Sequence, residues 1–350
     1  MMPEKNKDEP RNNILIHQTI IGQDLSNDLI SIVIPFKKLN PYVLECISNI
    51  SFLNYTSFEI ILLPDEVLDE IHLPKMEKKL CISIIPTGPV PPGVKRNIGT
   101  SHAKGSIIAF IDDDAYPDQN WLNNAIKLFH DPTVAAVGGP NLTPPSDGIM
   151  QRAGGLVLQS WIGGGGFSYR YKSRYPREDD DLPTVNLLIR RDVLNDLGGF
   201  EVKYYPGDDT YLCLQITKKL HKKIIYSPDV IVYHHRRPLF IPHMRQIWNY
   251  GKHRGYFAKK FPETSRKPLY FAPSVLVLSI ILSPILLLLP VILSQIYFVT
   301  IAIYLVVVTI EAIKTKNLKL FILFFIGILA THVSYGVGFL KGLLSKKLTK

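Results

Sequence analysis

The sequence predicts an α/β fold with a mostly parallel sheet, followed by a hydrophobic C-terminal region. Short apolar runs alternate with helical patterns between residues 30 and 111, which is typical of a doubly wound parallel sheet. From about residue 269 the chain consists largely of Leu, Ile, Val and Phe, in stretches long enough to cross a bilayer. We therefore expect a polar tail (1–28), an α/β domain (29–265) and a membrane region (266–350).

The elements of the α/β domain follow from hydrophobic periodicity and turn residues. Strands are expected over 31–36, 58–63, 80–85 and 106–111, with helices over 40–52 and 94–103. Further along we expect strands at 134–137 and 230–233 and helices at 210–220 and 243–257. Ligands collect at the carboxyl ends of parallel strands. Two of these ends carry Asp65 and the acids at 112–114.

The tail divides into three hydrophobic segments, roughly 270–293, 295–313 and 318–340. Only Ser294 and Gln295 separate the first two, which suggests a tight hairpin there. The lysine-rich stretch 314–319 should be cytoplasmic, but three full spans would place the lysines of 341–350 outside, against the same rule. Polar and small residues such as His332 interrupt the third segment, which favours an incomplete third crossing.

Composition limits the partners and the compartment. The formal net charge is +10, and many basic residues lie close to the apolar tail. This favours anionic lipid and phosphorylated substrates over nucleic acid, for which no recognition module is evident. Cys46, Cys81 and Cys213 form no CxxC pair, so we expect neither a disulfide framework nor a zinc ribbon. The polar N-terminus has no hydrophobic core of a signal peptide.

Three consecutive acids, Asp112, Asp113 and Asp114, follow a buried strand. Carboxylates in such a place are costly unless they are solvated, hydrogen-bonded or neutralised by a cation. Aspartates two apart can offer oxygens to a hard cation that also holds a diphosphate, so Asp112 and Asp114 are candidate residues at a metal. The alternative is an exposed acidic turn before Pro117.

The sequence around these acids resembles the family-2 glycosyltransferases of GT-A fold. The resemblance covers roughly residues 30–256, with separated motifs in the expected order. It implies a nucleotide-sugar donor (a UDP-, GDP- or dTDP-sugar) and a divalent metal, Mg²⁺ or Mn²⁺. The motifs that carry it are the strand ending at Pro35, the acid Asp65, Lys95-Arg96-Asn97 with the Asp112–Asp114 triplet, and Gly207-Asp208-Asp209 before a helix.

The resemblance also implies residue roles. Asp65 stands in LLPDE rather than the commoner Asp-Asp-Gly-Ser, which weakens its match. His234 could complete the metal site or touch the diphosphate. The implied donor-binding residues are Pro35, Asp65, Arg96, Asp112 and Asp113, and the implied metal ligands are Asp114 and His234.

Asp209 is the implied general base. The family usually has Glu-Asp here, whereas this chain has Asp208 as the first acid. One carboxylate would take the proton from the acceptor hydroxyl as it attacks the anomeric carbon. A cation would neutralise the leaving diphosphate, giving a single displacement with inversion. The alternative for Asp208 and Asp209 is capping of the helix N-terminus.

Other motifs concern the acceptor and the membrane. The stretch 246–254 resembles the Q…YG..R helix of membrane-associated members and not the QxxRW of processive synthases; it could also lie in the membrane interface with its cations reaching outward. Gly163–Gly166, 179–181 and Asn186 are expected to form an acceptor-side loop. The ending 332–339 resembles bacterial exopolysaccharide transferases of the succinoglycan type.

These observations predict an inverting, metal-dependent glycosyltransferase that acts on a lipid-linked or membrane-proximal glycan. We expect it in the cytoplasmic membrane as a multi-pass protein with its catalytic domain in the cytoplasm. One alternative is a polyprenyl-phosphate sugar synthase, in which the lipid phosphate is the acceptor and no hydroxyl base is needed. The other is a non-catalytic membrane scaffold that keeps the fold.

Overall fold

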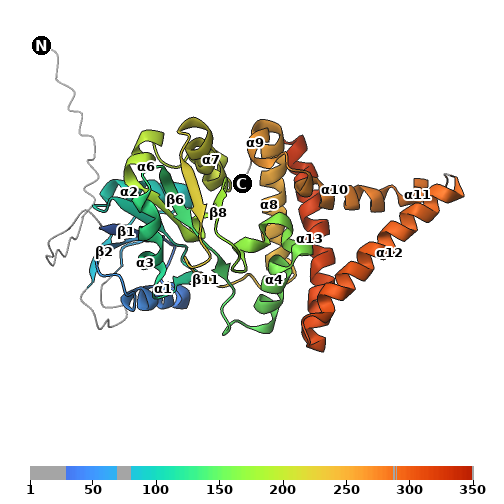
Figure 1. Cartoon of the computed structure of the whole chain (residues 1–350), viewed down its shortest axis with the longest axis horizontal. Coiled ribbons are helices and arrows are strands. Elements are labelled where there is room, and N and C mark those ends of the chain that lie inside the picture. The colour runs from blue at the N-terminus through green and yellow to red at the C-terminus, as the bar shows by residue number, and fades with distance from the viewer. Residues whose placement is uncertain (1–28, 69–79, 287, 289, 349–350) are drawn as a thin grey trace, which may run out of the picture.

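The structure is a computed structural model that describes residues 29–68, 80–286, 288 and 290–348. The predicted polar tail (1–28) lies outside these residues. Figure 1 shows a sheet flanked by helices next to a group of long C-terminal helices. The boundary expected at 265–266 falls between helices α9 (Pro262–Ser265) and α10 (Pro268–Ile281).

The central sheet has the strand order β3-β2-β1-β4-β9-β6-β10-β8. β9 is antiparallel to β4 and β6, and β8 is antiparallel to β10, whereas the other neighbours are parallel. The predicted mostly parallel sheet is therefore confirmed. Its strands are β1 (Ile30–Pro35), β2 (Phe58–Leu63), β3 (Cys81–Ile84), β4 (Ile107–Phe110), β6 (Val134–Gly138), β8 (Arg177–Asp179), β9 (Leu187–Arg190) and β10 (Lys223–Tyr226).

Helices cover both faces of the sheet, which explains why its strands are continuous apolar runs. Asn40 starts the first helix by accepting hydrogen bonds from the N–H groups of Tyr42 (2.9 Å) and Val43 (3.2 Å). One core contains α1 (Pro41–Ser51) and α3 (Trp121–Ile126), and the other contains α6 (Arg191–Leu197) and α7 (Asp208–Leu214). α2 (Pro92–His102) packs against β1 and β2.

A small second sheet places two predicted site residues side by side. It consists of β5 (Ala115–Pro117), β11 (Val232–His234) and β7 (Asn141–Leu142), in the order β5-β11-β7. In the antiparallel β5–β11 pair, His234 lies opposite Ala115. The N–H of His235 also donates to the carbonyl of Asp114 at 2.9 Å. This pairing brings the end of β11 to the acidic triplet, about 120 residues earlier in the chain.

Shorter turns and helices complete the domain. α7 continues into the π turn η6 (Gln215–Lys219), so the helix expected at 210–220 is present with a change of pitch. The remaining elements are η2 (Lys127–His130), α4 (Ile149–Gln159), α5 (Trp161–Gly164), η3 (Gly165–Arg170), η4 (Thr184–Asn186), η5 (Val202–Tyr204) and α8 (Ile241–Lys260).

The hydrophobic tail forms α10, α11 (Ser283–Leu286), α12 (Val291–Ile313) and α13 (Leu318–Leu344). The hairpin expected at Ser294-Gln295 is wrong, because α12 runs through both residues and the break lies between Ile281 and Val291. Prolines mark this break, whereas a uniformly apolar stretch gives no periodicity that would locate it. α12 and α13 are each long and apolar enough to cross a membrane.

The third hydrophobic segment, for which we expect an incomplete crossing, forms one continuous helix of 27 residues, α13. Its small residues pack closely against α8, which lies alongside it (Figure 1). A Cβ on Gly255 of α8 would collide with the backbone of Phe339, and a Cβ on Gly342 of α13 would collide with the backbone of Lys252. These glycines therefore serve helix–helix contact.

Candidate active site

The ends of β1 and β2 are held by a buried lysine. The ammonium of Lys95, on α2, donates to the carbonyls of Phe36 at 2.6 Å and Leu63 at 3.0 Å. It also pairs with Oδ1 of Asp65 at 2.5 Å. Asp65 is thereby fixed at the carboxyl edge of the sheet, next to the end of β1 with its buried Pro35. No individual role for Lys95 could be predicted, because its partners lie 30 or more residues away in the chain.

Arg96 links the acidic triplet to the second acidic motif. Its guanidinium bonds Oδ1 of Asp112 at 2.9 Å and lies 3.9 Å from Oδ2 of Asp208. The Arg96 side chain is buried, and despite that burial Asp112 and Asp208 raise its pKa, so it stays charged. Gly93 permits the approach of Asp208, because a Cβ there would lie 2.5 Å from its carboxylate. Arg96 thus joins two motifs that are more than 90 residues apart.

Two neighbouring side chains, His234 and Arg237, favour the ionised form of Asp114. Its Oδ1 lies 3.0 Å from Nε2 of His234, and its Oδ2 lies 3.1 Å from the guanidinium of Arg237. Burial alone would raise the pKa of Asp114, but His234 and Arg237 outweigh it and lower the pKa to about 2. For Asp113, burial together with Asp114 and Asp112 raises the pKa to about 7. The triplet therefore crowds negative charge at one edge of the sheet.

The hydrogen bonds of His234 bear on its predicted metal role. Arg236 lies 3.0 Å from Nδ1 of His234, and a guanidinium can only donate. The neutral ring then carries its proton on Nε2, which faces Asp114. A metal ligand would need that nitrogen free of its proton. This geometry favours His234 as a donor to an anion rather than as a metal ligand.

The neighbouring His235 has a structural role. Its Nδ1 lies 2.5 Å from Asp147 and its Nε2 lies 2.9 Å from Glu45. These contacts clamp β11 against α1 and the loop before α4. Both ring nitrogens of His235 therefore contact carboxylates. His235 is for this reason less available to a ligand than His234.

Asp209 lies at the start of α7, where the N-cap residue is Gly207. A Cβ on Gly207 would collide with the ring of His253, so α8 packs tightly over this helix end. Asp209 is not the capping residue; its Oδ1 accepts the N–H of Thr210 at 2.7 Å. Burial, with Asp208 and Asp181 nearby, raises the pKa of Asp209 to about 7. A carboxylate with that pKa is suited to accept a proton near neutral pH.

A buried network of ion pairs and hydrogen bonds holds Thr210, the residue whose N–H donates to Asp209. Oδ1 of Asp181 accepts the hydroxyl of Thr210 at 3.0 Å, and its other oxygen accepts the guanidinium of Arg254. Arg170 lies 3.4 Å from the same carboxylate. Arg254 is buried and points inward, so the interpretation of an interfacial cation reaching outward is wrong for this residue. The network ties α8 to the residue after Asp209.

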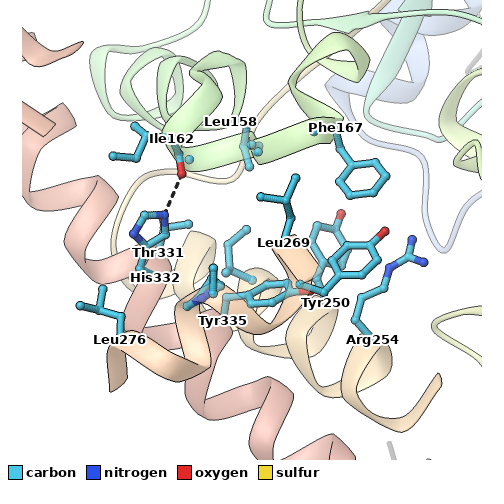
Figure 2. A pocket seen from close by; sticks show the side chains of 18 of the residues that line it. Leu158, Ile162, Phe167, Tyr250, Arg254, Leu269, Leu276, Thr331, His332 and Tyr335 are labelled. Carbon is cyan, nitrogen blue, oxygen red and sulfur yellow. Dashed lines mark hydrogen bonds between the residues drawn. The ribbon is translucent and has the colours of Figure 1, made fainter. Parts of the chain in front are cut away.

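A cavity of about 950 Å³ extends from this network into the C-terminal helices. Figure 2 shows Arg254, Tyr250 and Tyr335 on one side of it and Phe167 and Ile162 on the other. Of the residues expected in an acceptor-side loop, the glycine run and Asp181 line this cavity, whereas Asn186 accepts a hydrogen bond from the indole of Trp121 at 2.9 Å. The lining from α10 and α12 includes Val275, Leu276, Thr300, Ile301, Tyr304 and Val307.

Two tyrosine hydroxyls at the cavity lack partners within the described part of the chain. The hydroxyls of Tyr270 and Tyr335 are buried without a hydrogen bond, and both residues line the cavity. Arg254 lies 5.1 Å from the ring centre of Tyr270. Buried hydroxyls that are left unbonded are costly, so this end of the cavity is suited to polar groups of a ligand. The other end, between α10 and α12, is mainly apolar.

This fold and this arrangement of acids define a glycosyltransferase of GT-A type. Residues 31–198 match the model of glycosyl transferase family 2. A mannosyltransferase from Pyrobaculum calidifontis, solved with GDP-Man and Mn²⁺, shares the fold with a TM-score of 0.60. At 18% identity the two align over 93% of this chain and 92% of the other.

Two curated relatives differ in how much of their length is matched. A pre-mycofactocin glycosyltransferase of Mycobacterium tuberculosis is 26% identical over 193 residues, and the match spans 55% of this chain but only 40% of that protein. A Methanococcus voltae enzyme is 23% identical over 341 residues, covering 92% of this chain and 99% of its own. Its name describes a glucuronosyltransferase that acts on dolichyl N-acetylglucosaminyl phosphate.

Proposed function

We propose that the protein transfers a sugar from a nucleotide sugar to a lipid-linked glycan at the cytoplasmic face of a membrane, with inversion. The cavity carries this proposal. It joins the partly buried carboxylate of Asp209 to the apolar helices α10 and α12, most of whose large apolar side chains are exposed. An acceptor with a sugar at one end and a lipid at the other matches both ends of such a cavity. The full-length similarity to the Methanococcus enzyme supports this class of acceptor.

The donor is proposed to bind at the carboxyl edge of the sheet, near Pro35, Asp65 and Arg96. A divalent cation fits the acids there, because Mg²⁺ and similar ions are held by one or two carboxylates together with substrate phosphates. The described residues contain no group of three or more candidate metal ligands, so the diphosphate would have to complete the coordination. Asp114 is the proposed protein ligand, with Asp112 nearby. When bound, the cation would neutralise charge on the leaving diphosphate.

The chain's own residues then divide the work. Nε2 of His234 is placed to donate to Asp114 or to a diphosphate oxygen. Asp209, held by the Thr210 N–H, is proposed to remove the acceptor hydroxyl proton. Asp181 positions it through Thr210, while Arg254 neutralises Asp181. α8 closes this side of the site and keeps bulk water from the proton transfer.

The proposal is tested by incubating the membrane-bound protein with UDP-, GDP- and dTDP-sugars, Mn²⁺ and polyprenyl-diphosphate-linked monosaccharides. The expected product is a lipid-linked disaccharide whose new linkage has the inverted anomeric configuration. A product on unglycosylated polyprenyl phosphate, formed equally well by Asp209→Asn, would establish the polyprenyl-phosphate synthase instead. Failure to bind any nucleotide sugar would indicate a non-catalytic scaffold.

A further inference from the structure

α13 is packed against the α/β domain along its whole length. At its start Leu320 lies in a cluster with Ala153 of α4 and Leu239. In its middle the hydroxyl of Thr331 lies 2.9 Å from Nε2 of His243. At its end the carbonyl of Leu343 accepts the ammonium of Lys259 at 3.0 Å. The polar residues of α13 that interrupt its apolar sequence therefore face protein.

These contacts conflict with a perpendicular crossing of the membrane by α13. The contacts from Leu320 to Leu343 span ~35 Å at a rise of ~1.5 Å per residue, which exceeds the ~30 Å hydrocarbon core. α8 accompanies α13 over much of this length and exposes Arg245, Asn249 and Lys260 to solvent. A crossing by α13 would carry these polar side chains into hydrocarbon, which is costly. α13 instead exposes Leu318, Ile322, Ile326 and Val333 away from the domain.

The hairpin formed by α10, α11 and α12 extends too short a distance from the protein to cross the membrane. α10 starts against the protein: the hydroxyl of Ser274 donates to the carbonyl of Gly336 at 3.0 Å, and Val277 is buried. From Val277 to Leu288 a helix would extend only ~16 Å, about half of the hydrocarbon core. Figure 1 shows α12 returning at a slant from α11 to the start of α13. The length of α12, 23 residues, therefore reflects its tilt and does not mean that the helix reaches the opposite side of the membrane.

The charges agree with this shallow position. Between Lys267 and Lys314 the sequence has one charged residue, Glu311, and that residue pairs with Lys314 and with the indole of Trp161. The turn at 282–290 has no charge, although a loop that emerges from a membrane is normally polar. The lysines of 314–319 and 341–347 flank the two ends of α13, beside the α/β domain. Both clusters then meet the same anionic leaflet, which removes the conflict with the positive-inside rule.

We infer that the tail is a re-entrant anchor embedded in one leaflet, with α13 in the plane of the interface and the α10–α12 hairpin dipping into the hydrocarbon. The occupant of this apolar surface is thus a lipid bilayer entered from the cytoplasmic side only. The inference rests on the proposed membrane association but not on the transfer chemistry. Because α10 and α12 line the cavity, a lipid-linked acceptor would enter between them without leaving that leaflet.

Cysteine labelling in sealed membrane vesicles of both orientations tests this inference. Cys46 and Cys213 are buried, so Cys81→Ser gives a background with low labelling. Single cysteines are then introduced as Leu288→Cys at the hairpin tip, Lys319→Cys and Lys346→Cys at the ends of α13, and Val67→Cys as the reference for the α/β domain. Leu288 and Val67 are 86% and 77% exposed in the protein, so both react freely with a membrane-impermeant maleimide unless lipid shields them.

We expect the reference and both α13 variants to react from one face only, the same face for all three. Leu288→Cys should react from neither face until detergent is added. Reaction of Leu288→Cys from the face opposite the reference would show that the hairpin crosses, and opposite sidedness of the two α13 variants would show that α13 crosses. Reaction of Leu288→Cys as fast as the reference without detergent would show that no membrane holds the tail. None of these results depends on turnover, so a failed transfer assay leaves the test intact.

Discussion

Replacing Asp209 by Asn should lower the rate of sugar transfer and, at the same time, raise the stability of the folded protein above neutral pH. The substitution removes the proposed proton acceptor and keeps the size of the side chain, so donor binding should persist. Loss of a general base costs roughly 10²- to 10⁴-fold in rate. Burial and the neighbouring carboxylates also raise the pKa of Asp209 from an ordinary value near 4 to about 7. That difference corresponds to ~4 kcal/mol.

The sign of the stability effect follows from the direction of the pKa change. The folded protein binds this proton more tightly than the unfolded chain does, so the associated stability is fully present below pH ~4 and is lost as the pH rises to about 7. Asp209→Asn cannot ionise and should therefore be more stable than the wild type at pH 8, by ~2–4 kcal/mol. The wild-type transfer rate should rise with pH through about 7, and the residual rate of the variant should not.

Transfer rates under single-turnover conditions and unfolding followed by tryptophan fluorescence, both between pH 5 and 9, measure these effects. Asp196→Asn is the matched control, because this carboxyl is exposed on α6 and the same chemical change should alter neither quantity. A transfer rate for Asp209→Asn within about threefold of the wild-type rate would show that Asp209 is not the general base. A residual rate of the variant that still falls as the pH drops below 7 would show the same.

Three further predictions concern the metal, the helix contact and the buried arginine. EDTA should abolish transfer and Mg²⁺ or Mn²⁺ should restore it, and Asp114→Asn should raise the metal concentration for half-maximal activity at least tenfold; full activity without divalent metal contradicts this. Gly255→Ala should destabilise the α8–α13 contact by ~1–3 kcal/mol, whereas Gly148→Ala, which has room for a Cβ but replaces the N-cap residue of α4, should cost less than ~1 kcal/mol in the same thermal-unfolding assay. Arg96→Ala should cost ~3–5 kcal/mol by leaving the buried carboxylate of Asp208 uncompensated and by removing the partner of the partly exposed Asp112, and a loss below 1 kcal/mol in denaturant titration would argue against that network.

Much of the α/β domain could be predicted because its signals are local. Each of the first four strands is a short apolar run ended by a turn residue, and the observed bounds differ from the predicted ones by at most one residue. The acids at 112–114 and Asp209 stand directly at the ends or starts of such elements. The proximity of Asp65 to the acids at 112–114 required only the general rule that parallel strands end at one edge, whereas Asp209 is identified through the family resemblance.

Residues whose roles depend on distant contacts escaped prediction. Asp181 is expected in an acceptor-side loop, but its pairing with Arg254, 73 positions further along on α8, could not be predicted. Arg237 matters because the pairing of β11 with β5 brings it to Asp114. In the tail, composition identified apolar helices but not their partners. The polar residues of the third segment favour an incomplete crossing, and in the structure one of them, Thr331, faces a histidine of α8. Polarity within a helix does not reveal whether water, lipid or protein lies opposite.

In the proposed function, the protein glycosylates a lipid-linked sugar that is held in the cavity between Asp209 and the tail helices. The most direct measurement compares two acceptors with the same sugar diphosphate, one on a long isoprenoid and one on a short water-soluble alkyl group, with the same donor and metal. We expect at least a hundredfold higher kcat/KM for the isoprenoid acceptor than for the alkyl acceptor. With Asp209→Asn we expect no product from either acceptor. Equal kcat/KM for the two acceptors would contradict the proposed function.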